Sequence, residues 1–212
     1  ALKMALQSPE TLTSLHFLES MGINGHNADL DDASVESTTQ FFKYLAEEKQ
    51  VLLAYEDDSL STDERMSKKI ALYLLDFAEK SEKFRFHNYP VNQLFGVQNG
   101  FPTFMEAQHQ IHSLEDAEYY ISRLKQLPRK FEQVTEGLKI REDSRILPPT
   151  FVVSRVTAEM TGFVDTKVED NILYSSLKKK MQLKHLLTMT DGLYCLDCVR
   201  VSQGRSEPME YL

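Results

Sequence analysis

A chain of 212 residues, 42% of them hydrophobic and 26% charged, is long enough for one domain with a substantial core or for two small ones. Its net charge of −8 excludes an extended basic surface, so no nucleic-acid partner is expected, because phosphate binding requires clustered Lys and Arg. No apolar run approaches the ~20 residues that cross a bilayer, so no transmembrane segment is expected either.

The N-terminal region predicts two helices separated by a polar loop. Ser8 and Pro9 are typical of a helix start, with Ser as the cap and Pro at the first helical position. Leucines at helical spacing extend this helix towards Gly22, which is suited to end it. A longer helix is then predicted from about Ala33, with a nearby Asp or Ser as its cap.

A third helix is predicted after Ser61, which forms a capping box with Glu64. Five apolar residues follow at spacings i, i+4, i+7, i+8 and i+11: Met66, Ile70, Tyr73, Leu74 and Phe77. This spacing predicts one apolar stripe of an amphipathic helix. Because the link to the preceding helix is short, the two helices are expected to pack antiparallel.

Residues 87–102 interrupt the helical pattern and predict a structured loop, with a short helix entered at Phe101. Gly96 in this loop is expected to have a positive φ or to allow another segment to approach closely. Ser113 then caps a helix, with Asp116 as its capping-box partner, and Pro128 predicts the start of another.

The C-terminal third predicts two further helices after the Pro148-Pro149 break. Residues 150–161 are predicted to be helical and closed by Gly162, with a strand as the alternative because the start is rich in β-branched residues. Residues 168–181 form the last amphipathic pattern. The fold class is therefore mostly α, a helical array or bundle with little or no sheet. Residues 1–181 form its helical domain, and residues 182–212 form a divergent C-terminal segment of the same chain.

Two short runs carry a resemblance to a known family. The first is Tyr-Pro-x-Asn-Gln-x-x-Gly, from Tyr89 to Gly96. The second is Ser-x-x-Asp-Ala-x-x-Tyr-Ile-x-Arg-Leu, from Ser113 to Leu124. With fainter similarity from Ser8 to about Met181, the chain resembles the bacterial "domain of unknown function 885" proteins, which are zincin-like predicted metallopeptidases and often lipoproteins.

The resemblance implies a largely helical fold with a deep channel, a peptide substrate, and a zinc ion bound by the full-length protein. It also implies a periplasmic or lipid-anchored location in the cell envelope. The family's zinc motif lies downstream of the matched region, and no His-Glu-x-x-His occurs in this chain. We therefore expect the N-terminal helical portion of such a protein, inactive alone and without a cofactor of its own. It would pack on a missing C-terminal part or self-associate. The alternative is a non-catalytic helical interaction or scaffold domain.

Two patterns resemble fragments of metal sites. Glu106-x-x-His109 could be half of a di-metal carboxylate site, but no second copy exists to complete it. Cys195-Leu-Asp-Cys198 is half of a four-cysteine zinc site without a second pair. Hydrogen bonding on the helix face or between helices is the favoured role of Glu106 and His109. No metal site and no catalytic residue is predicted in this chain.

The best candidate for a functional surface is the loop that carries Asn92 and Gln93. Carboxamides both donate and accept, so they suit holding a peptide backbone, although fixing the loop itself is the favoured alternative. Tyr89 could line the same cleft. Arg123 could meet a substrate carboxylate bidentately, or pair with an acidic residue on a neighbouring helix. These four residues are the candidates for substrate binding.

Overall fold

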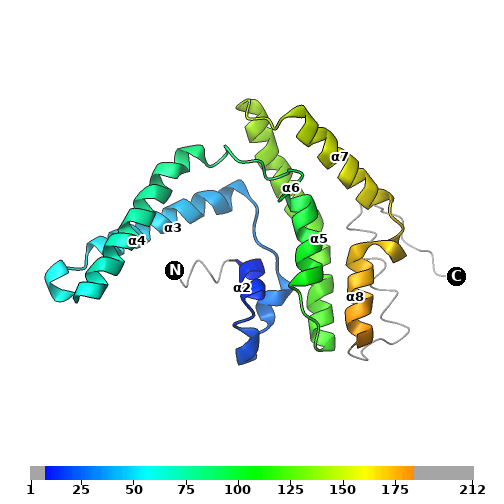
Figure 1. The fold of residues 1–212 in the computed structure, drawn as a ribbon, viewed down its shortest axis with the longest axis horizontal. Helices are drawn as coiled ribbons and strands as arrows, with labels where there is room; N and C mark the ends of the chain where they lie inside the picture. The colour runs from blue at the N-terminus through cyan, green and yellow to red at the C-terminus, as the bar shows by residue number, and fades with distance from the viewer. Residues whose placement is uncertain (1–7, 184–212) are drawn as a thin grey trace.

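The computed structural model describes residues 8–183, and within them every regular element is a helix and none is a strand. The predicted fold class is confirmed. Figure 1 shows α5 (Val97–Ala107), α6 (Leu114–Asp143) and α8 (Ile172–Leu183) side by side, with the other helices arranged around them. In this part of the chain, no helix has the length and the apolar character needed to cross a membrane.

The core lies between α5, α6 and α8. Met105, Tyr120, Leu124, Leu173 and Leu177 expose no more than 1% of their surface. The Tyr120 hydroxyl donates to the backbone carbonyl of Leu173 at 2.9 Å, so the buried phenol is paired as burial requires.

The first helix is shorter than predicted. α2 (Pro9–Leu15) ends where His16 adopts a left-handed conformation with φ of 51°. Gly22 closes a separate 3₁₀ turn, η1 (Glu19–Met21), and a second 3₁₀ turn, η2 (Gly25–Ala28), follows. The leucine spacing alone could not reveal this interruption, because it is compatible with one continuous helix.

Helices α3 (Val35–Leu53) and α4 (Thr62–Ser81) form an arm that projects from the other helices (Figure 1). The predicted capping box at the start of α4 is present, and the two helices pack against each other as expected. Lys49 of α3 forms ion pairs with Asp76, at 2.7 Å, and with Glu79 of α4. The short 3₁₀ turn η3 (Asp57–Ser59) lies in the link between the two helices.

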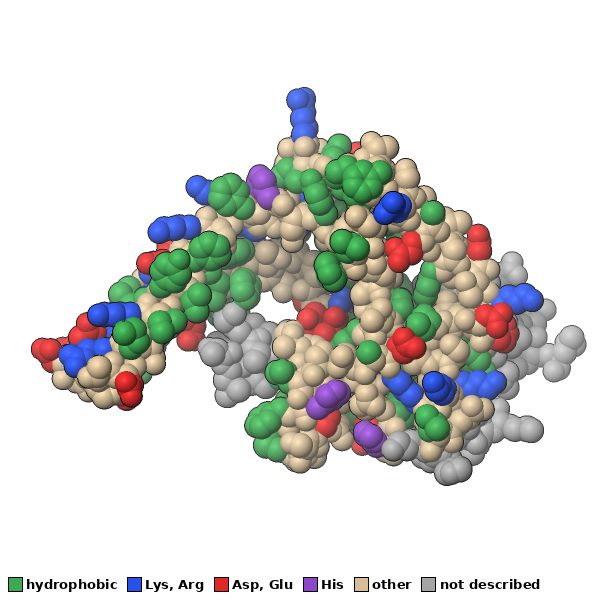
Figure 2. Space-filling view, viewed as in Figure 1, with side chains coloured by type: hydrophobic (Ala, Val, Ile, Leu, Met, Phe, Trp, Pro, Cys, Tyr) green, Lys and Arg blue, Asp and Glu red, His purple; other side chains and the backbone are tan. Residues whose placement is uncertain are grey.

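The predicted apolar stripe of α4 lies on the surface of this arm. Its five residues are each 55–71% exposed, and no residue of α3 or α4 is buried. Figure 2 shows the hydrophobic side chains along the arm. The half-buried residues of α4 include Leu72 and Leu75, which lie on a different side of the helix at 100° per residue. Among residues 8–183 the stripe is therefore an uncovered face and does not form the contact between the two helices.

Helix α6 runs for 30 residues through Pro128, so the prediction of a new helix at Pro128 was wrong. A proline inside a helix costs about 3 kcal/mol, because it removes one hydrogen bond and crowds the preceding turn. Leu124 and Leu127, just before it, are both buried in the core. Packing on this side of the helix outweighs the local cost of the proline.

The remaining boundaries differ from the sequence predictions by a few residues. α5 begins at Val97, four residues before Phe101, and the 3₁₀ turn η4 (Glu82–Phe84) ends the preceding helix. α7 (Thr150–Asp165) is a helix, so the strand alternative is wrong, and it continues past Gly162. The 3₁₀ turn η5 (Val168–Asp170) leads into α8. The Cys195 and Cys198 motif lies outside the described residues.

Candidate functional site

The loop over residues 85–96 is held together by Asn92. Its Oδ1 accepts hydrogen bonds from the backbone N–H groups of Leu94, at 2.9 Å, and Phe95, at 2.8 Å. Its Nδ2 donates to the backbone carbonyl of Tyr89 at 2.9 Å. The carboxamide thus pairs backbone groups that no helix satisfies, which is the loop-fixing role that the sequence favoured.

The other two loop candidates differ in how they are used. Tyr89 donates its hydroxyl to the backbone carbonyl of Leu147 at 3.2 Å, which ties the loop to the segment between α6 and α7. Gln93 is half-buried, and its side chain makes no hydrogen bond within residues 8–183. Among the described residues, Gln93 is therefore the loop candidate whose polar side-chain group is left to bind a ligand.

A glycine is required at position 96 because the backbone of Asn92 lies close to it. Its φ is −70°, so the alternative of a positive φ is wrong. A Cβ atom at this position would lie 2.5 Å from both the backbone N and O of Asn92 and 2.0 Å from Oε1 of Gln98. The backbone turns so tightly here that only a glycine fits without movement of the loop.

We expect Gly96→Ala to lower the free energy of unfolding by about 1–3 kcal/mol, because the added methyl group overlaps fixed backbone atoms. Gly100→Ala is the matched control, since nothing lies within 4 Å of its Cβ position inside α5. That change should stabilise the protein by about 0.5–1 kcal/mol through helix propensity. Urea unfolding of both variants measures the difference. Equal stabilities would show that the loop relaxes at no cost.

A pocket of about 450 Å³ opens beside this loop, between α5, α6 and α7. Its walls are mainly apolar and include Phe101, Leu127, Phe131 and Phe163. Polar groups come from Gln98, Asn99 and Glu159. The Gln98 side chain links the pocket to the loop, because its Nε2 donates to the backbone carbonyl of Asn92 at 2.7 Å.

Arg123, the fourth candidate, is fully buried away from solvent. Its guanidinium donates to the backbone carbonyls of Asp29, at 2.8 Å, and His26, at 3.2 Å. It also donates to the Thr13 hydroxyl at 2.7 Å and to Nδ1 of His109 at 2.7 Å. Burial lowers the pKa of Arg123 to about 10, so the group stays charged at neutral pH. These contacts leave no route to a substrate carboxylate, and within the described residues Arg123 has no ion pair.

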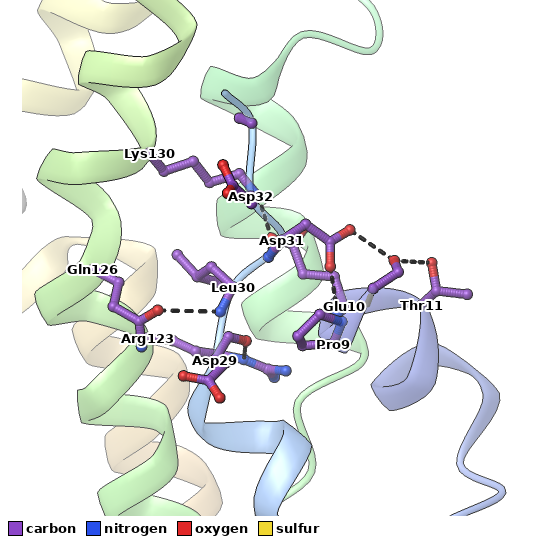
Figure 3. A network of polar contacts seen from close by, with 12 residues as sticks. Pro9, Glu10, Thr11, Asp29, Leu30, Asp31, Asp32, Arg123, Gln126 and Lys130 are labelled. Atoms are coloured by element: carbon purple, nitrogen blue, oxygen red, sulfur yellow. Dashed lines mark hydrogen bonds and ion pairs between the residues drawn. The ribbon is translucent and has the colours of Figure 1, made fainter. Parts of the chain in front are cut away.

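The N-terminal segment that carries His26 and Asp29 makes further hydrogen bonds and an ion pair (Figure 3). The backbone N–H of Leu30 donates to Oε1 of Gln126 at 3.3 Å. Glu10 and Asp31 each accept the other's backbone N–H at 3.0 Å, and Lys130 forms an ion pair with Glu10. Burial raises the pKa of the Asp31 carboxyl. The N-terminal segment is thus clamped onto α6 by paired polar groups.

His109 takes part in the same network. Its Nδ1 accepts from Arg123, so its Nε2 carries the proton and donates to the Asp116 backbone carbonyl at 3.1 Å. Burial, and then the positive charge of Arg123, lower the pKa of His109 to about 3. Both ring nitrogens are occupied, which leaves neither for a metal ion.

No metal centre can be assembled from the part of the chain that the structure describes. Those residues contain no group of three or more His, Cys, Asp or Glu side chains that could hold a metal ion. Glu106 and His109, the weak candidates from the sequence, do not form one. The described residues therefore do not fit the zinc ion that the family resemblance implies for the full-length protein.

The sequence did not reveal the pocket, because the helix predicted for residues 150–161 ended before the α7 residues that line it. Ending that helix at Gly162 excludes Phe163 and Val164, which line the pocket together with Met160. The signal that could have found it is the spacing of Met160, Phe163 and Val164, at i, i+3 and i+4, on one helical face. An exposed glycine late in a helix costs only about 1 kcal/mol and does not end it by itself.

Comparisons with known proteins place the chain among its relatives. The family described as "Bacterial protein of unknown function (DUF885)" matches residues 16–191. Among solved structures, the chain is similar to "the putative lipoprotein from Colwellia psychrerythraea", with a TM-score of 0.71 and 16% sequence identity. The match covers 94% of this chain and 39% of that chain, so this chain spans well under half of the solved protein. At this identity the likeness shows the fold alone. No curated protein matches.

Proposed function

The chain belongs to the family of bacterial proteins of unknown function called DUF885, and from this premise we propose that it is the N-terminal helical portion of a zincin-like metallopeptidase. In this proposal the zinc ligands and catalytic groups come from sequence outside this chain. The chain contributes helices to one wall of the substrate channel. The description of the solved relative as a "putative lipoprotein" supports a cell-envelope location.

The observation that carries the proposal is the uncovered stripe of α4. Five large apolar side chains occupy one face of a 20-residue helix, and each is more than half exposed. Covering such a face contributes about 1–2 kcal/mol per side chain, and a folded protein rarely leaves so large an apolar patch open. The match covers 39% of the solved relative. In this proposal the rest of such a longer fold covers the stripe.

Within that channel wall, Gln93 is the residue proposed to contact a peptide. Tyr89 and Asn92 are proposed to position it, since their polar groups already fix the loop. Arg123 is proposed to support this wall from within, because all its contacts are internal. Replacement of Gln93 by Ala should weaken peptide binding by the full-length protein and leave its stability unchanged.

The test is to express the gene's whole reading frame beside residues 1–212 and to assay both with fluorogenic peptides. Hydrolysis that is lost on chelation and restored by zinc is expected only from the longer product. A reading frame without His-Glu-x-x-His, together with no hydrolysis, would overturn the proposal.

The second candidate is a non-catalytic helical interaction domain. It is favoured by one observation: within the described residues the core cluster is already buried, whereas the arm offers an open apolar face. A reading frame that ends at Leu212, with a cooperative melting transition of the 212-residue chain, would support this candidate over the peptidase.

For the 212-residue chain, we expect Phe77→Glu to lower self-association and binding of a hydrophobic dye without lowering the melting temperature. Phe77 is 67% exposed, so its loss removes little buried contact while placing a charge on the stripe. Gln110→Glu, an exposed change of equal charge outside the stripe, is the control. Sedimentation velocity measures association. A destabilised Phe77→Glu variant would show that the stripe is already packed.

A further inference from the structure

The pocket between α5, α6 and α7 is built for an apolar group. α5 supplies Phe101, α6 supplies Leu127 and Phe131, and α7 supplies Met160 and Phe163. Its volume of about 450 Å³ lies within the range of roughly 300–1,000 Å³ that is usual for small-molecule sites. The body of a ligand that fits here must therefore be apolar.

Most hydrogen-bond donors at the polar end of the pocket are already used. Nε2 of Gln98 donates to the carbonyl of Asn92 and to Oε2 of Glu159, at 2.7 and 3.2 Å, so both its N–H bonds are used. Nδ2 of Asn99 lies 3.4 Å from a loop carbonyl, and the Thr103 hydroxyl donates to the backbone carbonyl of Asn99 at 2.9 Å. At this end a ligand acceptor would find only the second N–H bond of the Asn99 amide.

Acceptors, in contrast, are in excess there. Oε1 of Gln98 and Oδ1 of Asn99 are shielded from water and accept no hydrogen bond within residues 8–183. They act through their partial negative charge. Glu159 is exposed at the pocket, and in the same part of the chain no Lys, Arg or His lies within 4 Å of its carboxylate. The electrostatic potential at this end favours a cation.

We propose that this pocket binds a ligand with an apolar body and a primary ammonium head. The head would donate to the Glu159 carboxylate, which Gln98 holds against the loop, and the body would lie between Phe101, Phe131 and Phe163. An ammonium group brings three donors and no acceptor, which suits the exposed Glu159 carboxylate. Its positive charge suits the partial negative charge of the two shielded carboxamide oxygens. The inference is independent of the proposed function, since it needs only residues of this chain.

The experiment titrates the 212-residue chain at pH 7 with phenethylamine and, separately, with 3-phenylpropionate. The two probes share an apolar body of similar size and differ in the charge of the head. NMR shifts of the methyl groups of Leu127, Met160 and Val164 report binding in the pocket. The amine is expected to bind about tenfold or more tightly than the acid, as a charge-assisted hydrogen bond predicts.

Two variants locate the charge that makes this difference. Glu159→Gln should remove the preference for the amine, because the amide keeps the shape and loses the charge. Asp165→Asn, an equal charge change on the same helix outside the pocket, should keep it. Equal affinities of the two probes, an amine that does not saturate, shifts confined to other methyl groups, or a preference unchanged in Glu159→Gln would each overturn the proposal.

The same ammonium chemistry occurs in free amines and at the N-terminus of a peptide. Leu-Leu amide with a free N-terminus, compared with its N-acetylated form, separates the two sources. Tighter binding of the free peptide than of phenethylamine identifies a peptide N-terminus, and weaker binding identifies a free amine. Equal binding of the acetylated and free peptides would contradict the role of Glu159.

Discussion

Replacing Arg123 with Met is expected to lower the free energy of unfolding by about 3–5 kcal/mol, because it removes a buried charge that ties three segments together. The guanidinium satisfies the backbone carbonyls of His26 and Asp29, and it also pairs with Thr13 and His109. A thioether donates to none of them. Buried acceptors left without a partner each cost about 1–3 kcal/mol.

Arg129→Met is the matched control for this change. Arg129 lies on the same helix and is exposed, so its loss should change stability by less than about 0.5 kcal/mol. Arg123→Lys should fall between the two, since one ammonium group cannot reproduce the fork of donors. Urea unfolding followed by circular dichroism measures all three. An Arg123→Met variant within about 1 kcal/mol of Arg129→Met would contradict the role assigned to the buried guanidinium.

The helices whose starts depend on local chemistry could be predicted from the sequence. Ser61 with Glu64, and Ser113 with Asp116, form the two capping boxes as read from the sequence. A capping box satisfies backbone groups within four residues, so its outcome does not depend on the rest of the fold. The same holds for the tight loop at Asn92, whose side chain bonds groups two and three residues ahead.

The continuity of helices could not be predicted in this way. Pro128 and Gly162 are local signals for a boundary, yet α6 and α7 pass through them. Each signal is worth about 1–3 kcal/mol, which burial of a few neighbouring side chains can offset. Tertiary packing therefore determines whether a helix continues through such a residue. The pocket depends on this continuity, because Phe163 lies just beyond Gly162.

Helical periodicity likewise could not predict that the α4 stripe is exposed. Spacing shows that Ile70, Leu74 and Phe77 share a face, but not what covers that face. Arg123 is a comparable case among the site candidates. Its residue type suits both a substrate carboxylate and a buried network, and only the position of residues about a hundred places away, such as Thr13, separates the two.

The stability of the protein is expected to fall steeply as pH drops from about 6.5 towards 3, and His109 is the main single cause. In the unfolded chain His109 binds a proton below its ordinary pKa of about 6.5. In the folded protein burial and Arg123 keep it neutral until its pKa of about 3. Between these values the unfolded state binds more protons, so acid favours unfolding. Above about pH 6.5 the full stability is present.

The loss attributable to His109 is on the order of 4 kcal/mol across this window, at 1.36 kcal/mol per pKa unit. His109→Gln should flatten the pH dependence above pH 4.5, where carboxylates contribute least, because a carboxamide can accept from Arg123 and donate to the Asp116 carbonyl without titrating. His112→Gln, at an exposed histidine three residues away, should keep the wild-type slope. Urea unfolding at pH 4.5, 5.5, 6.5 and 7.5 gives the slopes. If His109→Gln and His112→Gln lose stability in parallel with the wild type, the buried imidazole is not what titrates.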